Sequence, residues 1–399
     1  IAIGNTAGAI QSVDNCIAVG LNAGASQTVG DSHIAIGNTA GTAQTTGSCV
    51  AIGKNSGAAQ TDNCVSIGNS SGTNQGARSV AIGSSAQGTT AALSGEDSVA
   101  IGTNAGGQQQ GASSVAIGDN AGTQLQTANC VAIGNNAGQF DQATLSVAVG
   151  NNAGSGLTGN ALYAQQTRGI AIGSSAGQYT QGARSIALGE NAGQGTNTDT
   201  VDGQGTQCIA IGSNAGQLRQ LQSAVAIGQN AAQSDQAAGS VAIGPNAGRI
   251  SQLAESVAIG SSAGFYNQQN LAIAIGANTA LGTSGVISDG QATQAIAIGN
   301  NAAQFKQGQA AIAIGYEAAI GVAGVSGQGD NAVCVGSSTI ANGDGGIAIG
   351  NSANCASFTN SICIGSSATA TSNDDIVIGN GSTSGSGTLT FNGLSAVGG

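Results

Sequence analysis

Residues whose side chains commonly perform catalysis or bind metals are few and scattered in this chain. His33 is the only histidine, and it precedes a predicted strand, at a position where similar segments of the chain have Ser or Cys. We therefore expect it to be a surface or edge residue. A single histidine of this kind does not provide a Ser-His-Asp or Cys-His arrangement. We expect no enzymatic activity and no cofactor.

The cysteines also lack the spacing of a metal site. There are eight, and none forms a Cys-x-x-Cys pair or a Cys/His cluster. Five of them share one position of a repeat, just before a β-branched residue, where Ser or Ala otherwise occurs: Cys16, Cys49, Cys64, Cys130 and Cys208. The favoured interpretation is that they are small buried residues replacing Ser. Disulfides between neighbouring coils or chains are the alternative.

Motifs for phosphate, calcium, nucleic acid or membrane binding are also missing. No helix is predicted after any glycine cluster, as a phosphate loop requires, and the acidic segments 343–345 and 374–375 are isolated. Seven Lys and Arg against a net charge of −11 leave no basic stripe for nucleic acid. No apolar run reaches the roughly 18 residues that span a bilayer. We expect no metal site, no nucleic-acid partner and no membrane insertion within this segment.

The chain is instead dominated by one repeat. A tetrad of Ile or Val, any residue, Ile, Val or Leu, and Gly occurs 23 times, and in eleven of the 22 intervals its glycines are sixteen positions apart. The segment 240–255 is one complete unit, and it begins again at Ser256. A fixed short period of this kind is typical of a solenoid, in which each coil packs only against its neighbours.

The period also predicts the shape of one coil. Alternation places the two apolar residues of the tetrad on one face of a strand and the middle residue on the other. A polar pair and Ala-Gly then form a turn, and the remaining residues a second strand and turn. We predict an all-β, flattened parallel β-roll of about 23 coils of 14–23 residues. At about 4.8 Å per coil it would be a rod on the order of 110 Å long. The solenoid would cover 1–383, with 14–15-residue units from about 336, and 384–399 would be a cap or a junction.

Two columns of amide side chains are candidates for structural ladders. The second residue after the tetrad glycine is Asn, Ser or Thr in 21 of 23 copies, and a Gln recurs in nine of the eleven sixteen-residue units. Stacked amides can bond the turn backbone and their equivalents in neighbouring coils. The predicted ladder residues are Asn104, Asn120, Asn136, Asn152, Asn214, Asn230, Asn246, Gln126, Gln142, Gln220, Gln236 and Gln252. A binding array of amides is the alternative.

The middle residue of the tetrad suggests a partner. It is Ala in 19 copies, whereas a strand face exposed to water normally acquires Thr, Lys, Glu or Gln. Both faces of the sheet would then be covered, one by the coil interior and the other by copies of the same chain. Candidates for this oligomer face are Ala116, Ala132, Ala148, Ala226, Ala242 and Ala258. The alternative is a small-residue face inside a monomer of unusual cross-section.

Three long intervals, those after Gly150, Gly189 and Gly276, interrupt the repeat. Their inserts, 155–168, 195–207 and 281–294, are rich in Gly, Thr and Asn and are predicted to leave the rod as loops. Loops on a rigid scaffold are common sites of partner contact. Candidate contact residues are Tyr163, Arg168, Asp199, Asp202 and Asp289.

The repeat itself resembles a known family. Ser-Val-Ala-Ile-Gly at 79–83, 114–118, 240–244 and 256–260, with Ser-Ser-Ala at 84–86 and 261–263, is similar to the head repeats of YadA-like trimeric autotransporter adhesins. The resemblance implies a left-handed parallel β-roll, three chains packed side by side, and binding to matrix or host surfaces. Arrays of Ala-Ile-Gly-x-Asn-Ala-Gly also resemble those in predicted surface or fibre proteins of large DNA viruses.

We therefore expect a structural and interaction protein. It would form the rod or head section of an extracellular or cell-surface fibre, assemble as a homotrimer, and display loops to a host or surface ligand that the sequence does not identify. A virion surface fibre and an end-to-end matrix filament are the alternatives. An ice- or glycan-binding solenoid is less favoured, because the outward Thr-x-Thr rows expected for ice binding are lacking.

Overall fold

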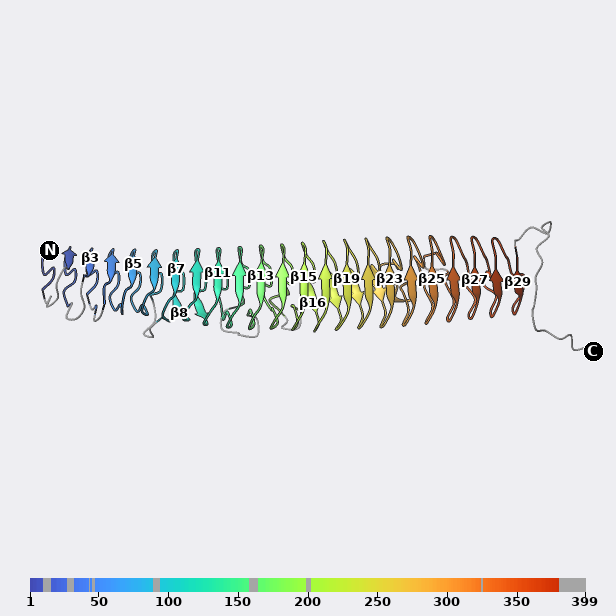
Figure 1. Cartoon of the computed structure of the whole chain (residues 1–399), viewed down its shortest axis with the longest axis horizontal. Coiled ribbons are helices and arrows are strands. Elements are labelled where there is room, and N and C mark those ends of the chain that lie inside the picture. Colours follow the sequence, from blue (N-terminus) through green and yellow to red (C-terminus); the bar gives the residue numbers. More distant parts are fainter. Residues whose placement is uncertain are drawn as a thin grey trace, which may run out of the picture. The chain divides into compact units, whose positions relative to one another are not determined.

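The computed structural model describes residues 1–9, 16–26, 32–42, 44, 47–88, 94–157, 164–198, 202–323 and 326–379. The chain is a parallel β-solenoid, as the repeat predicts, with 23 tetrad strands. It comprises two compact units, Ile1–Ser251 and Gln252–Gly399, and each is described by itself. In both units the tetrad strands follow one another as parallel arrows (Figure 1). The predicted cap at 384–399 lies outside the described residues.

The tetrad strands are two or three residues long because each ends at the tetrad glycine. In the first unit they are β1 Ala2–Ile3, β2 Ile17–Val19, β3 Ile34–Ile36, β4 Val50–Ile52, β5 Val65–Ile67, β6 Val80–Ile82, β7 Val99–Ile101, β9 Val115–Ile117, β11 Val131–Ile133, β12 Val147–Val149, β13 Ile170–Ile172, β14 Ile186–Leu188, β15 Ile209–Ile211, β17 Val225–Ile227 and β19 Val241–Ile243. In the second unit they are β21 Val257–Ile259, β23 Ile273–Ile275, β24 Ile296–Ile298, β25 Ile312–Ile314, β26 Val333–Val335, β27 Ile347–Ile349, β28 Ile362–Ile364 and β29 Ile376–Ile378.

The second side of the coil is less regular. Its strands are β8 Gln108–Gln110, β10 Gln124–Gln126, β16 Leu218–Gln220, β18 Ser234–Gln236, β20 Ile250–Gln252 and β22 Tyr266–Gln268, and a 3-10 turn, η2, spans Ile287–Asp289. The central residue of these strands has a left-handed backbone, with φ of 53° at Leu125 and 51° at Arg219. That conformation interrupts the strand. Many coils therefore pair here through single bridges, such as Gln165 with Gln181.

Register is maintained by stacking identical residues. Ala132 pairs with Ala116 in one neighbouring coil and with Ala148 in the other. The tetrad glycines stack in the same way, and Gly134 has a φ of 129°. A Cβ added to Gly134 would lie 2.5 Å from the carbonyl oxygen of Gly150 in the next coil. No other residue fits at this close approach, so every coil keeps its glycine.

The interior of a coil is narrow and holds one layer of small side chains and one amide. In the coil that begins at β11, Ala132, Ala137, Gln142 and Ser146 are all fully buried. The Gln142 amide donates to the Val131 carbonyl at 3.0 Å, so its polar group is satisfied inside. An interior of this width favours a small residue on the tetrad strand: the middle residue is Ala in 19 tetrads, and it is Val only at Val377 in β29, the last tetrad strand.

The prediction that the Ala column forms an outward oligomer face is therefore wrong. Its six candidates are each 0% exposed and point into the coil: Ala116, Ala132, Ala148, Ala226, Ala242 and Ala258. The physical reason is volume. The two branched residues of each tetrad are too large for the interior, so alternation puts Ala inside and places them outside.

Candidate interaction face and inserted loops

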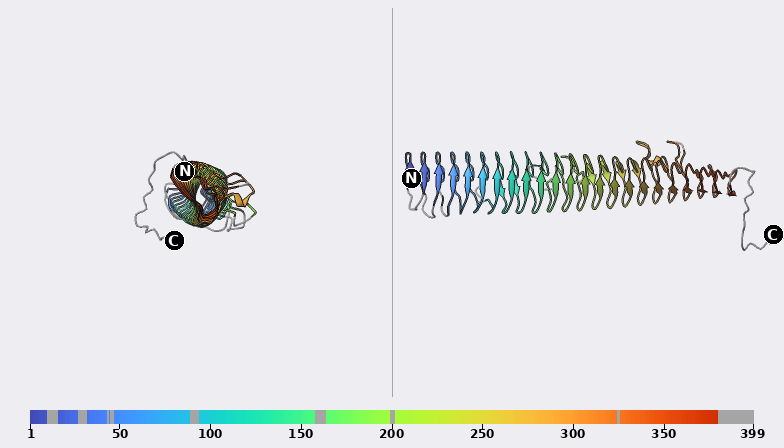
Figure 2. Two further views of the ribbon diagram at one scale, coloured as in Figure 1. Left: turned by 90° about the vertical axis from the view of Figure 1, so that its right-hand side faces the viewer. Right: turned by 45° about the horizontal axis from the view of Figure 1, so that its top comes forward.

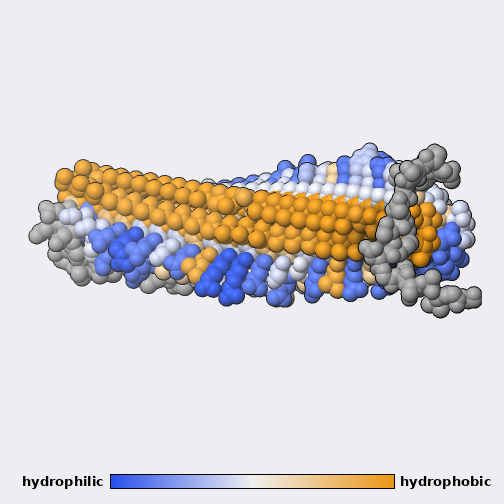
Figure 3. All heavy atoms as spheres, turned by 45° about the vertical axis from the view of Figure 1, so that its right-hand side comes forward, coloured by the Kyte–Doolittle hydropathy of each residue, from blue (hydrophilic) through white to orange (hydrophobic). Residues whose placement is uncertain are grey.

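The first and third residues of the tetrad strands form an outward row of branched apolar side chains, here called the apolar face. The first residues are half-buried, and many third residues are exposed by more than a third of their area, such as Ile133 and Ile243 at 37% each. None of the 23 tetrads has a polar or charged residue at either position. Figure 3 shows the apolar side chains gathered on one side of the coils.

This face reaches the size of the largest apolar patches on monomeric proteins. The 15 tetrad strands of the first unit, spaced by about 4.8 Å with rows about 6.7 Å apart, cover roughly 450 Å² between the centre lines of the rows alone. Apolar patches beyond a few hundred Å² generally mark an interaction site. Charged residues border the rows, such as exposed Arg78 on one side and exposed Asp119 on the other. An apolar centre with a polar rim is typical of a protein interface.

The Asn column forms a hydrogen-bonded ladder in the turn after the tetrad. The predicted residues all have left-handed backbones with φ between 54° and 58°, and they are Asn104, Asn120, Asn136, Asn152, Asn214, Asn230 and Asn246. The Asn136 amide donates to Asn152 at 3.0 Å, and Asn214 and Asn230 each donate to the next Asn at 3.1 and 3.2 Å. Asn104 donates to Asn120 at 3.1 Å. Asn tolerates this backbone better than most residues, which explains why it occupies the turn.

The Gln column forms a second ladder, and it lies inside the coil. Gln126 donates to Gln142, Gln220 to Gln236 and Gln252 to Gln268, at 2.9 to 3.1 Å. The column also contains buried Gln residues that were not predicted, in coils of other lengths, including Gln60, Gln75, Gln165, Gln204, Gln291 and Gln328. Four of them could have been recognised from the sequence, because Gln165, Gln204, Gln291 and Gln328 each come directly after an insert. A buried, mutually bonded amide column stabilises the stack and is inaccessible to a ligand.

One coil supplies its ladder amide from another position. Gln87 occupies the site of the Ala-Gly turn glycine, with a φ of 48°, and its amide donates to Gln110 at 2.7 Å. A third amide column runs along the outside of the second side in the first unit. Gln194 donates to Gln178, Gln217 to Gln194 and Gln233 to Gln217, at 3.0 to 3.2 Å. Neither the position of Gln87 nor the outer Gln column was predicted, because the sequence does not show which side of the coil these side chains face.

The inserted loops leave the coil at one position, directly before the second-side Gln. The loops in the intervals after Gly189, Gly276 and Gly315 each begin and end at a pair of glycines in close contact. A Cβ on Gly195 would lie 2.8 Å from the Cα of Gly203, one on Gly282 3.3 Å from Gly290, and one on Gly321 3.2 Å from Gly327. Removing 196–202, 283–289 or 322–326 would restore the sixteen-residue interval in each case. Figure 2 shows loops projecting from the coil outline. The coil therefore continues unchanged beneath these three loops.

The predicted contact residues of these loops have different environments. Tyr163 and Asp199 lie outside the described residues. Arg168 is exposed in the turn before β13, and Asp202 accepts a hydrogen bond from Thr196 at 3.1 Å within its loop. Asp289 is only 2% exposed, so its prediction as a contact residue is wrong. Its backbone is also held against the next coil, because the Lys306 amide donates to the Asp289 carbonyl at 2.7 Å.

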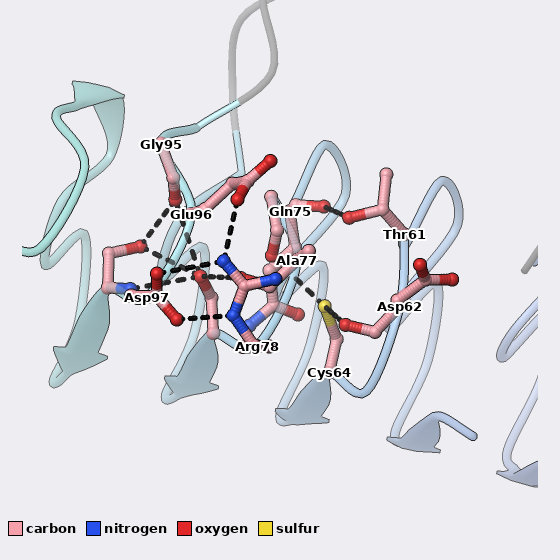
Figure 4. A network of polar contacts seen from close by, with 12 residues as sticks. Thr61, Asp62, Cys64, Gln75, Ala77, Arg78, Gly95, Glu96 and Asp97 are labelled. Carbon is pink, nitrogen blue, oxygen red and sulfur yellow. Dashed lines mark hydrogen bonds and ion pairs between the residues drawn. The ribbon is translucent and has the colours of Figure 1, made fainter. Parts of the chain in front are cut away.

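Ion pairs occur on the surface of the first unit. Arg78 contacts Glu96 and Asp97, both at 2.6 Å (Figure 4), and Arg219 contacts Asp235 at 2.5 Å. The hydrogen bond from Arg78 lowers the pKa of the Asp97 carboxyl group. These side chains are about half exposed, and solvent-screened pairs of this kind contribute little to stability.

The second unit has a polar groove of about 340 Å³ beside the loop that contains η2. Its lining includes Ser288, Lys306, Asp330 and Asp344. Asp344 accepts the Asp330 amide at 3.0 Å, and Asp330 accepts the Gln309 amide at 2.8 Å. These carboxylates thus stabilise turns between coils. No cluster of three or more His, Cys, Asp or Glu side chains could hold a metal within the ranges that the structure describes.

His33 has a different position from the one expected. It is fully buried, and its Nδ1 accepts the Cys49 amide at 3.4 Å, so the expectation of a surface or edge residue is wrong. In the part of the chain that the structure describes, no helix has the length and apolar character to cross a membrane. No protein-family model matches the chain, and a search of curated proteins also finds no match.

Proposed function

We propose that this chain is a section of an extracellular or cell-surface fibre in which three copies pack side by side through their apolar faces. The observation that carries the proposal is the exposed double row of Ile and Val, which continues through every described coil of each unit. The bulky residues that form the core of most proteins lie outside here. A partner that covers them gains the hydrophobic stabilisation that a single coil lacks.

A second copy of the chain is the partner that fits this face. The rows repeat at the spacing of one coil, about 4.8 Å, over the whole of each unit. A partner that interdigitates with these rows must have apolar residues at the same spacing. A second copy of the chain has this spacing because its sequence is the same. Closed rotational symmetry then produces a discrete oligomer. The likeness of the repeats to YadA-like adhesin heads favours three copies.

The stoichiometry can be tested by native mass spectrometry of the purified chain. The monomer mass is 37.7 kDa, and the trimer should have three times that mass. A species of one chain at micromolar concentration would contradict the proposal.

In this assembly the inserted loops are the attachment elements. They leave the second side of the coil, so packing through the tetrad strands leaves them accessible. The coil continues unchanged beneath them, so sequence variation there has little cost to the fold. We propose that they contact a host, matrix or other surface ligand.

Loop excision tests this display role without disturbing the coil. Deleting 196–202 joins Gly195 to Gly203, which are already in contact, and restores the sixteen-residue unit. Deleting 283–289 does the same in the second unit. Both variants should keep the β circular dichroism spectrum and the assembly mass, and lose adhesion of chain-coated beads to cells or matrix. Unchanged adhesion in the double deletion would contradict the role of these loops.

A further inference from the structure

One interior column of the first unit holds a concentration of reactive side chains. In successive coils, the residue before the tetrad is Cys16, His33, Cys49, Cys64 and then Ser79. All five are buried. Only between Cys49 and Cys64 do two thiols occupy neighbouring coils of this column. Cys130 and Cys208 occupy the same column farther along the chain and have no thiol neighbour there.

The backbone brings Cys49 and Cys64 level with each other. The Val50 amide donates to the Cys64 carbonyl at 2.9 Å, and Val50 pairs with Val65 in the parallel ladder. Residues paired in this way are about 4.8 Å apart. Disulfides join Cα atoms that are roughly 4.4 to 6.8 Å apart. The two coils therefore have the separation that a disulfide requires.

Both side chains of the pair reach the turn that precedes Cys64. The Cys49 thiol donates to the Thr61 carbonyl of this turn at 2.8 Å. The Cys64 thiol lies 3.4 Å from the Asp62 carbonyl of the same turn and 3.1 Å from the Gly76 carbonyl of the next coil, and Figure 4 shows the Cys64 side chain beside Asp62. Equivalent neighbours in this column show how closely such groups approach. Ser79 and Ser98 oxygens are 3.1 Å apart, and the Cys130 sulfur is 3.7 Å from the Ser146 oxygen.

We propose that Cys49 and Cys64 are an oxidisable pair that forms a disulfide between two neighbouring coils. With hydrogen peroxide as oxidant, the Cys64 thiol loses its proton and its sulfur attacks one peroxide oxygen. The O–O bond breaks, Cys64 becomes a sulfenic acid, and the departing hydroxide takes up that proton and leaves as water. The Cys49 sulfur then attacks the Cys64 sulfur, the S–O bond breaks, and the departing hydroxide takes up the proton of the Cys49 thiol and leaves as a second water. Two thiols and one hydrogen peroxide thus give one disulfide and two waters.

The electrostatic environment agrees with these roles. The side-chain interaction between the two thiols lowers the pKa of Cys64 and raises the pKa of Cys49. The thiolate is the nucleophile in such reactions, so Cys64 is the attacking residue and Cys49 the resolving one. The bond would close the short loop between these two cysteines and hold two coils together. This inference does not depend on the proposed fibre function.

Peptide mapping can locate the bond because the chain has few tryptic sites. Trypsin cuts after Lys54 and Arg78, which places Cys49 in peptide 1–54 and Cys64, as the only cysteine, in peptide 55–78. The reduced, folded chain is treated with hydrogen peroxide, quenched with catalase, unfolded in N-ethylmaleimide and digested. We expect a fall from eight to six alkylated thiols and a cross-linked pair of these two peptides.

Matched variants identify the partner. Cys49→Ala should abolish the cross-link, whereas Cys16→Ala and Cys130→Ala should keep it. Ala occupies this column elsewhere, at Ala224 and Ala272, so these variants should fold, and circular dichroism checks that they do. Failure of the wild type to form the link while Cys64 remains a thiol or becomes a sulfinic acid would overturn the proposal. A cross-link that persists in Cys49→Ala would also overturn it, by assigning the bond to Cys16.

Discussion

The two faces of a tetrad strand differ in a way that inverts the usual rule for globular proteins. The inward face has the smallest apolar side chain, Ala, opposite a buried amide. The outward face has Ile and Val, whose exposed area is about 37% in residues such as Ile133. The difference shows that the width of a coil, and not hydrophobicity, decides which residue enters it. In the proposed assembly, association between chains buries the larger side chains.

The largest effect should come from enlarging the inward residue. Ala132→Leu adds three heavy atoms to a closed interior that also contains Ala137 and Gln142. We expect a loss of about 3 kcal/mol or more in the free energy of unfolding, because overpacked interiors force neighbouring side chains and backbone to move. Thermal and urea unfolding followed by circular dichroism measure it.

The control is Ile133→Leu on the adjacent outward position, for which we expect a change below about 1 kcal/mol in the monomer. Equal losses for the two variants would mean that the faces do not differ as the coil geometry requires.

A smaller loss of stability is expected when one glutamine of a single coil is replaced, and its size should differ between the inner and the outer amide column. Gln220 donates to the Ile209 carbonyl at 2.9 Å and to Gln236, and it accepts from Gln204. Gln220→Ala leaves these groups unpaired inside and creates a cavity, so it should cost about 2 kcal/mol. Gln217→Ala removes an amide of the outer column, where water can replace it, and should cost less than about 1 kcal/mol. Urea unfolding of both variants makes the comparison, and a larger loss for Gln217→Ala would contradict it.

The smallest effect concerns a coil of the second unit without the Gln ladder. Asp375 caps a turn there by accepting from the Thr371 amide at 2.7 Å, the Ser372 hydroxyl at 2.9 Å and the Ser372 amide at 2.9 Å. These bonds lower the pKa of its carboxyl group to about 2, below its ordinary 3.8. The capping contribution is therefore complete above pH 3.8 and is lost as the pH falls through about 2.

Hydrogen exchange of the β29 amides should accordingly rise as the pH falls from 4 to 2, relative to the intrinsic rate. Asp375→Asn should show the faster relative exchange at both pH values and no step between them. If the exchange rate of Asp375→Asn rose by the same factor between pH 4 and 2, the pH dependence would belong to another group.

Much of this fold could be predicted from the sequence because residues that stack on one another in neighbouring coils recur at regular intervals along the chain. The tetrad glycines, the Asn turn and the Gln column recur where neighbouring backbones or amides meet, so their spacing predicts coils, register and ladders. The orientation of the strand could not be predicted in the same way. Alternation separates Ala132 from Val131 and Ile133 but does not say which face is inside. That depends on the coil width, which the left-handed turns and the buried Gln142 determine together.

The inserts, too, could be predicted only in part. Their length indicated loops, but the contacts between Gly195 and Gly203 and the burial of Asp289 follow from the coil beneath them. His33 was misplaced for the same reason, since its column faces the interior.

The central claim, that association covers the outward rows, is tested most directly by equilibrium sedimentation. The wild-type chain is compared at one concentration with the variant Ile133→Glu/Ile172→Glu/Ile243→Glu, whose changes all lie on exposed positions of the apolar face. The wild type should have a mass of three chains, and the variant should have a single-chain mass with an unchanged β spectrum. A wild type that sediments as one chain, or a variant that keeps the wild-type assembly, would contradict it.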